Sequence, residues 1–204
     1  MREDYEKGGE NPHYASHYAK DIDDIIESGF LRAASRVKLK ILVLGPSYES
    51  PDYAGLRVPS RNRIRELGHD AEFPEEIPDE TVKRMLNDRD IQIQDVDSLL
   101  SNWTAKELIL IRLYDFAVVL VVSPGSISEF STFFANQSIA SKMRVYVRQE
   151  HLKADSYIAA GPLDALKKVH NNVEGFGEKK DLLEKIEAFV RNAAKLKFIS
   201  GVYS

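Results

Sequence analysis

Cysteine is absent from the chain's 204 residues. Disulfides, thiolate nucleophiles and metal sites held by cysteine are therefore excluded in any cellular compartment. Long hydrophobic runs are missing too, since the longest, over residues 116–122, is far too short to cross a bilayer. The amino-terminal residues are charged and polar and lack the apolar stretch of a signal peptide. We therefore expect a soluble, cytoplasmic protein with no membrane partner.

A strong excess of either charge is also lacking. The 28 lysines and arginines stand against 32 aspartates and glutamates, with the signs interspersed and a net charge of −4. A general nucleic-acid-binding protein carries a basic face, so binding of that kind is not expected. Hydrophobic residues make up 43 % of the chain, which is enough to fill a core. The length fits one domain with additions better than two independent domains.

From residue 38 onward, apolar runs alternate with amphipathic segments. Runs that end in turn residues predict buried parallel strands over residues 39–44, 70–73, 116–122, 144–148 and 172–176, with the third at the centre. Helical spacing predicts helices over residues 57–67, 80–86, 97–114, 126–141, 163–169 and 179–196. This alternation predicts an α/β fold, a parallel sheet sandwiched by helices, in a single domain over residues 38–204. Residues 1–37 are expected to form an N-terminal helical extension that packs on the domain or on a partner subunit.

Ligands of parallel sheets bind beyond the carboxyl ends of the strands, so two loops are candidates for a site. The first follows residues 39–44 and begins Gly45, Pro46, Ser47, Tyr48. Gly45 allows the backbone to come close to a ligand, and Ser47 can bind phosphate or sugar oxygens together with the amides of a helix start. An ordinary loop rich in turn-forming residues explains the same sequence equally well.

The second loop follows residues 116–122 and reads Ser123-Pro124-Gly125-Ser126-Ile127-Ser128-Glu129. Small residues at Gly125 and Ser126 would leave space for a ligand above the strand end, and Glu129 would lie in the first helical turn near that space. A purely structural interpretation explains this loop equally well, because Ser126 is a favourable N-cap and Glu129, three positions later, completes a capping box.

Together these segments resemble the nucleoside 2-deoxyribosyltransferase family. The likeness spans about residues 39–150 and rests on Leu42-Val43-Leu44-Gly45-Pro46, a helix ending in Leu67-Gly68-His69, and Asp115 leading a strand into Gly125-Ser126-Ile127-Ser128-Glu129. The wider group includes nucleotide N-glycosidases and ligand-sensing Rossmann-like domains of the SLOG type. The resemblance implies a Rossmann-like sheet with flavodoxin-like strand order, Glu129 as the nucleophile that attacks the anomeric carbon, and a homo-oligomer.

Ser123 departs from the pattern of the deoxyribosyltransferases, which usually carry an acidic residue there. A serine is closer to relatives that hydrolyse nucleoside monophosphates, because a carboxylate would repel a phosphate whereas a hydroxyl can donate a hydrogen bond to it. The arginines over residues 57–65, beginning with Arg57, could supply the complementary positive charge. For each arginine taken singly, a solvated helix face is the better interpretation.

Other residues could assist the cleavage of a glycosidic bond. The departing base must be protonated, and Glu75 or Glu76 could act as that acid. Tyr48 and Phe130 could stack on a base or could belong to the core. Asp115 begins the predicted central strand, at the end away from the predicted site, and we expect no catalytic role for it.

Two further patterns favour ordinary structure. His13, His17 and Asp21 recur at four-residue steps and could ligate a metal from one helix face, but no further ligand is evident and surface polar residues are the better explanation. The Gly175-Phe176-Gly177 triplet lacks the third glycine of a dinucleotide fingerprint and predicts a turn. Neither a metal nor a cofactor is expected.

Three functions stay open at this point. The first is hydrolysis or base transfer at the N-glycosidic bond of a nucleoside or nucleotide, through Glu129 and the surrounding loops. The second is a non-catalytic module of the same fold that senses a nucleotide and passes the signal to a partner. The third is an oligomeric structural protein whose loops provide only caps and turns.

Overall fold

The computed structural model describes residues 29, 36–122, 133, 135–152, 164, 167–168 and 171–201. The chain divides into two compact units, one over residues 38–191 and the other formed by residues 1–37 together with 192–204. The larger unit holds the sheet and the candidate site. Most of the predicted N-terminal extension over residues 1–37 lies outside the described residues, and so do four of the seven residues of the predicted helix over 163–169.

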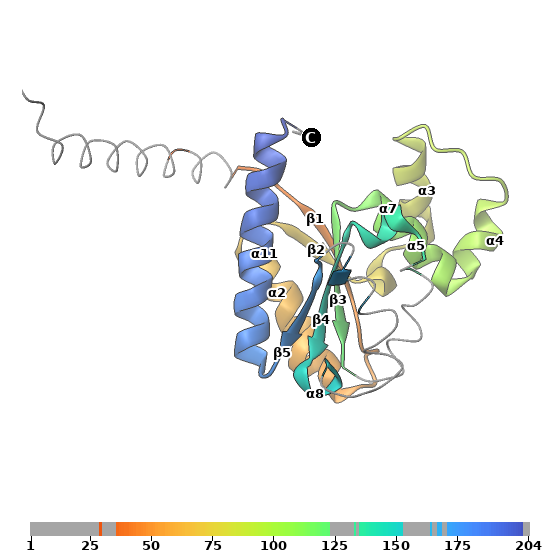
Figure 1. The fold of residues 1–204 in the computed structure, drawn as a ribbon. Coiled ribbons are helices and arrows are strands. Elements are labelled where there is room, and N and C mark those ends of the chain that lie inside the picture. Colours follow the sequence, from red (N-terminus) through yellow and green to blue (C-terminus); the bar gives the residue numbers. More distant parts are fainter. Residues whose placement is uncertain are drawn as a thin grey trace, which may run out of the picture. The chain divides into compact units, whose positions relative to one another are not determined.

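A five-stranded, wholly parallel sheet forms the centre of the larger unit (Figure 1). Its strands are β1 (Lys40–Leu44), β2 (Asp70–Glu72), β3 (Phe116–Val121), β4 (Met143–Arg148) and β5 (Val173–Phe176). The spatial order is β2-β1-β3-β4-β5, so β3 is central as its hydrophobicity predicts. The predicted α/β class and flavodoxin-like order are confirmed.

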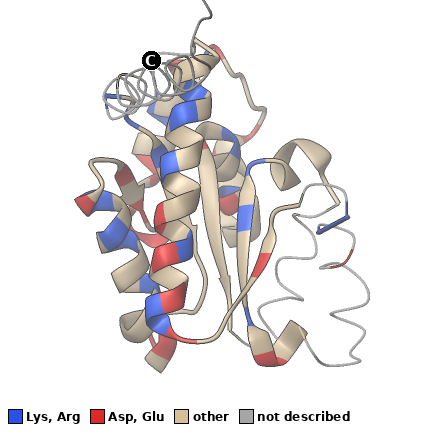
Figure 2. Ribbon diagram, turned by 60° about the vertical axis from the view of Figure 1, so that its left-hand side comes forward, with Lys and Arg blue, Asp and Glu red and all other residues tan. Residues whose placement is uncertain are grey.

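Helices cover both faces of this sheet (Figure 1). One face carries the π-helical turn η1 (Tyr53–Arg57), α2 (Val58–Glu66) and the first part of α11 (Lys179–Ile199). The other carries α3 (Asp79–Asn87), α4 (Val96–Ser101), α5 (Trp103–Leu113) and α7 (Gln137–Ala140). Two short helices lie in loops: η2 (Pro74–Glu76) and α8 (Gln149–Leu152). Figure 2 shows basic and acidic residues interspersed along the helices.

The core lies on both sides of the sheet, which explains the continuous apolar runs. Alternate residues of β1, Leu42 and Leu44, belong to the buried cluster that includes residues of α3, α4, α5 and α7. On the opposite face the Phe116 ring packs edge-on against Phe189 of α11, with centroids 5.4 Å apart. The Tyr146 hydroxyl donates to the Lys185 carbonyl at 3.1 Å, which also attaches α11 to that face.

Two predicted helices are wrong in their extent. The segment over residues 97–114 is interrupted at Asn102, whose extended backbone separates α4 from α5 and whose side chain accepts a hydrogen bond from the Ala105 amide at 3.0 Å. The segment over residues 126–141 is interrupted at Asn136, which caps α7 in the same way by accepting from the Ser138 amide at 3.1 Å. Asparagine is a strong N-cap and a weak interior residue, so it begins a helix at both positions.

Among the described residues, no helix has both the length and the apolar character needed to span a membrane.

Candidate ligand site at the carboxyl edge of the sheet

The strand order reverses between β1 and β3, and this switch point is where ligands of open α/β sheets bind. The two strands pair directly, with Leu44 beside Val119. The loop after β1 and the chain that leaves β3 therefore start from neighbouring strands at the same edge. Of the predicted site residues, Ser123, Gly125, Ser126 and Glu129 lie outside the described residues, as does Phe130.

Gly45 sits at the carboxyl end of β1 in a conformation that favours glycine. Its φ is +153°, and a Cβ at this position would lie 3.0 Å from the Leu120 Cβ and 3.2 Å from the Leu120 carbonyl oxygen. Both the backbone angle and the contact with β3 exclude a larger residue without local rearrangement. Packing between β1 and β3 therefore explains the glycine at position 45 without a bound ligand.

Arg57, at the end of η1, is the most buried of the predicted site residues, with 2 % of its surface exposed. Its Nε and NH2 groups donate to the Val43 carbonyl at 3.2 and 3.0 Å, and NH1 donates to the Pro46 carbonyl at 3.1 Å. NH1 and NH2 also bind the two Glu75 oxygens at 2.6 and 2.8 Å. A guanidinium has five N–H donors, so all of them are occupied within the protein. Arg57 therefore fixes the loop after β1 from inside.

The other arginines of the predicted basic cluster are also paired. Arg61 binds Glu76 at 2.6 Å and lies over the Phe73 ring, 4.0 Å from its centroid. Arg65 donates to the Ala71 carbonyl at 2.8 Å. Glu75 and Glu76, the two candidate acids, are therefore both partners of arginines. These contacts attach η2 and β2 to α2, through Glu76 for Arg61 and through the Ala71 carbonyl for Arg65.

Ser47 and Tyr48, the other predicted site residues of the β1 loop, are exposed. The Ser47 carbonyl accepts from the Ser50 amide at 2.9 Å, which closes a turn. Tyr48 is 73 % exposed at the tip of that turn. Its ring is therefore accessible for stacking, as the sequence suggests.

A second set of polar side chains lies where β3 and β4 end. Arg148, the last residue of β4, binds Asp52 of the β1 loop with 2.5 Å between NH2 and Oδ1. His151 of α8 has its Nε2 3.0 Å from the carbonyl oxygen of Val122, the residue after β3. Because a carbonyl only accepts, Nε2 carries the proton in this contact.

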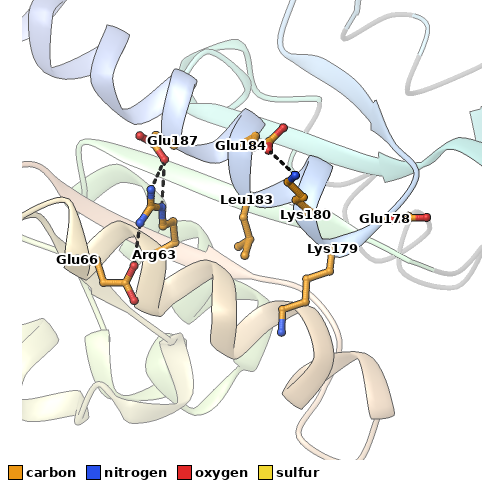
Figure 3. Close-up of a pocket in the computed structure, with 8 residues that line it drawn as sticks. All are labelled: Arg63, Glu66, Glu178, Lys179, Lys180, Leu183, Glu184 and Glu187. Atoms are coloured by element: carbon orange, nitrogen blue, oxygen red, sulfur yellow. Dashed lines mark hydrogen bonds and ion pairs between the residues drawn. The ribbon is translucent and has the colours of Figure 1, made fainter.

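A groove of about 580 Å³ lies elsewhere, between α2 and the first turns of α11 (Figure 3). Two of its basic side chains pair with acidic ones: Arg63 with Glu66 and Glu187, and Lys180 with Glu184 at 3.9 Å. The hydrogen bond from Arg63 holds the pKa of Glu187 below its ordinary value, and Arg191 adds to this effect. Arg63 of the predicted basic cluster lines this groove, but Glu66 and Glu187 hold it, and we assign the groove to helix packing.

Within the described part of the chain, no group of three or more histidine, aspartate or glutamate side chains is arranged to hold a metal ion. His13, His17 and Asp21 lie outside that part. Asp115 lies at the amino edge of the sheet, where its Oδ2 accepts from the Lys40 amide at 2.8 Å. It is therefore remote from the carboxyl edge, as expected.

A model of the STM3845 retron effector protein family matches residues 73–199, which is more than half of the chain. The chain belongs to this family. Membership indicates an effector or sensing role. No curated protein matches the chain.

The family match spans β3, β4 and the residues at their carboxyl ends, whereas β1 and its loop precede it. Arg148 and His151 thus lie inside the matched region, and sequence reasoning overlooked both. The signal was present, because Arg148 ends a strand that the sequence predicts and the carboxyl end of every parallel strand faces the same edge. The contact between Arg148 and Asp52 could not be predicted from the sequence, since these residues are 96 positions apart.

Proposed function

We propose that this retron effector acts in defence by cleaving the N-glycosidic bond of a nucleoside or nucleotide at the carboxyl edge of its sheet. The observation that carries the proposal is the switch point between β1 and β3, from which both loops of the deoxyribosyltransferase-like motif depart. The family match supports an effector role, and the resemblance of the loops supplies the chemistry.

Glu129 would attack the anomeric carbon as the bond to the base breaks, giving a covalent glycosyl–enzyme intermediate by analogy with retaining glycosidases. The bonding electrons would leave with the base, which takes up a proton from an acid or from water. Attack on the intermediate by water would complete a hydrolysis, whereas attack by a second base would complete a transfer. In both cases the Glu129 carboxylate is released unchanged.

The described loop residues have supporting roles in this proposal. Arg57 holds the Pro46 carbonyl and so fixes the loop that carries Ser47 and Tyr48. Tyr48, which is exposed, would stack on the base. Ser123, Gly125 and Ser126 would line the space above β3, with Ser123 donating to a phosphate. We expect a homo-oligomer that completes this site across a subunit contact.

A non-catalytic nucleotide-sensing module is the second candidate function. It is favoured by the pairing of both candidate acids, because Glu75 binds Arg57 and Glu76 binds Arg61. Both carboxylates are thereby engaged by guanidinium groups of the protein itself.

The test is chromatographic. Purified protein is incubated with nucleosides, nucleoside mono- and triphosphates and NAD, and released base or nicotinamide is quantified. We expect release from at least one substrate class, reduced by at least about 100-fold in Glu129→Gln. Glu184→Gln, an exposed glutamate of the α11 groove, is the matched control and keeps full activity. Release that persists in a folded Glu129→Gln protein contradicts the proposal, and no release from any compound favours the sensing module.

A further inference from the structure

Arg148 differs from Arg57 in how many of its donors are used. Its side chain is 32 % exposed, and within the described residues its one partner is Asp52, contacted through NH2. At least three of the five guanidinium N–H groups therefore have no acceptor among the described residues. Arg57, by contrast, has all five occupied.

The position of this ion pair is informative. Asp52 lies in the loop after β1, Arg148 ends β4, and β3 lies between these two strands in the sheet. The Arg148–Asp52 pair therefore joins the two sides of the carboxyl end of β3. His151 contacts Val122 directly after β3. Polar side chains from two separate elements thus converge at the switch point, where a ligand of such a sheet binds.

We propose that Arg148 forms an anion subsite at this edge and binds the phosphate of a nucleotide ligand. This inference rests on the proposed function, because it takes the ligand there to be a nucleotide. It also replaces the source of positive charge expected from the sequence, since the five Arg57 donors are all occupied. Arg61 and Arg65 bind partners on η2 and β2, which β1 separates from β3.

The chemistry of the pair suits such a ligand. A guanidinium binds a phosphate through two parallel N–H···O bonds, which supplies geometric selectivity as well as charge. The Asp52 carboxylate holds one edge of the guanidinium and so orients the donors that remain. Because the side chain is only about one-third exposed, a bound phosphate would be partly shielded from water and the contact would be strengthened.

The experiment compares nucleosides with their 5′-monophosphates. Binding is measured by isothermal titration in the Glu129→Gln background, which prevents turnover. We expect at least one monophosphate to bind about 10-fold or more tightly than its nucleoside, a difference of about 1.4 kcal/mol. Arg148→Gln should remove this preference while leaving nucleoside affinity within about 2-fold of the parent.

Arg144→Gln is the matched control, because Arg144 lies on the same strand at its other end and binds Glu174 at 2.6 Å. It should keep the preference for the monophosphate. Arg148→Lys covers the case in which the glutamine variant fails to fold, and should keep the charge but lose most of the preference. An unchanged preference in the Arg148 variants, or none in the parent, overturns the inference. Loss of base release alone contradicts only the proposed function, because these affinities need no turnover.

Discussion

The two edges of the sheet use their polar side chains differently. At the amino edge, side chains form hydrogen bonds with backbone groups. Asp115 accepts from the Lys40 amide at 2.8 Å, and Lys142 donates to the Arg112 and Tyr114 carbonyls at 2.7 and 2.8 Å. At the carboxyl edge, Tyr48 is largely exposed, and Arg148 contacts the other described residues through NH2 alone. The first arrangement stabilises the strand starts, whereas the second leaves groups available to a ligand.

Arg57 lies at the carboxyl edge but is not available to a ligand. It behaves like the residues of the amino edge, since its donors are all taken by Val43, Pro46 and Glu75. Residue type and edge are therefore insufficient to assign a binding role. Donors that remain after internal pairing, on a side chain that lies beside the end of β3, are the better criterion.

The largest effect is expected for Arg57→Met. It removes a buried guanidinium and leaves Glu75 and two carbonyls without their donor, which should lower the free energy of unfolding by about 3 kcal/mol. Arg148→Met is the matched comparison and should cost less than about 1 kcal/mol, because both members of its ion pair are partly exposed. Equilibrium urea unfolding measures both. Equal losses would remove the distinction between the two arginines.

An intermediate effect is expected at the amino edge for Asn172→Ala. The buried Asn172 amide donates to the Ala140 and Met143 carbonyls, both at 2.8 Å. Losing both bonds should cost about 2 kcal/mol in urea unfolding, while nucleotide affinity stays unchanged. A variant that loses nucleotide binding without losing stability would show that the amino edge also serves the ligand.

The smallest effect concerns pH and His69, whose Nδ1 accepts from the Leu39 amide at 3.4 Å. Burial lowers the pKa of His69 below its ordinary value of 6.5, opposed by the nearby Asp70. The unfolded chain then binds a proton more readily than the folded one, so this contribution is complete above pH 6.5 and is lost as the pH falls through the folded pKa. His69→Gln should flatten the decline in unfolding free energy on acidification, and an unaltered decline would exclude His69 as its source.

Much of the fold could be predicted because buried parallel strands are encoded locally. The apolar run that forms β3 and the glycine after β1 are visible in the sequence, and the order of the strands followed from the resemblance. The interruptions at Asn102 and Asn136 were missed although the signal is local, since asparagine followed by a helical segment is an N-cap pattern.

The ion pairs of the arginines could not be predicted from the local sequence in the same way. Arg63 pairs with Glu187, which is 124 positions distant, and Arg57 with Glu75 across two elements. A run of basic residues indicates positive charge but not which charges the fold itself neutralises. The side chains that stay available become apparent only once long-range ion pairs are known.

A crystal structure of the Glu129→Gln protein with a nucleoside 5′-monophosphate tests the central claim most directly. The account predicts the nucleotide at the carboxyl edge, beside the ends of β1 and β3, with its phosphate within hydrogen-bond distance of Arg148. A nucleotide bound in the groove between α2 and α11, or at the amino edge, would contradict it.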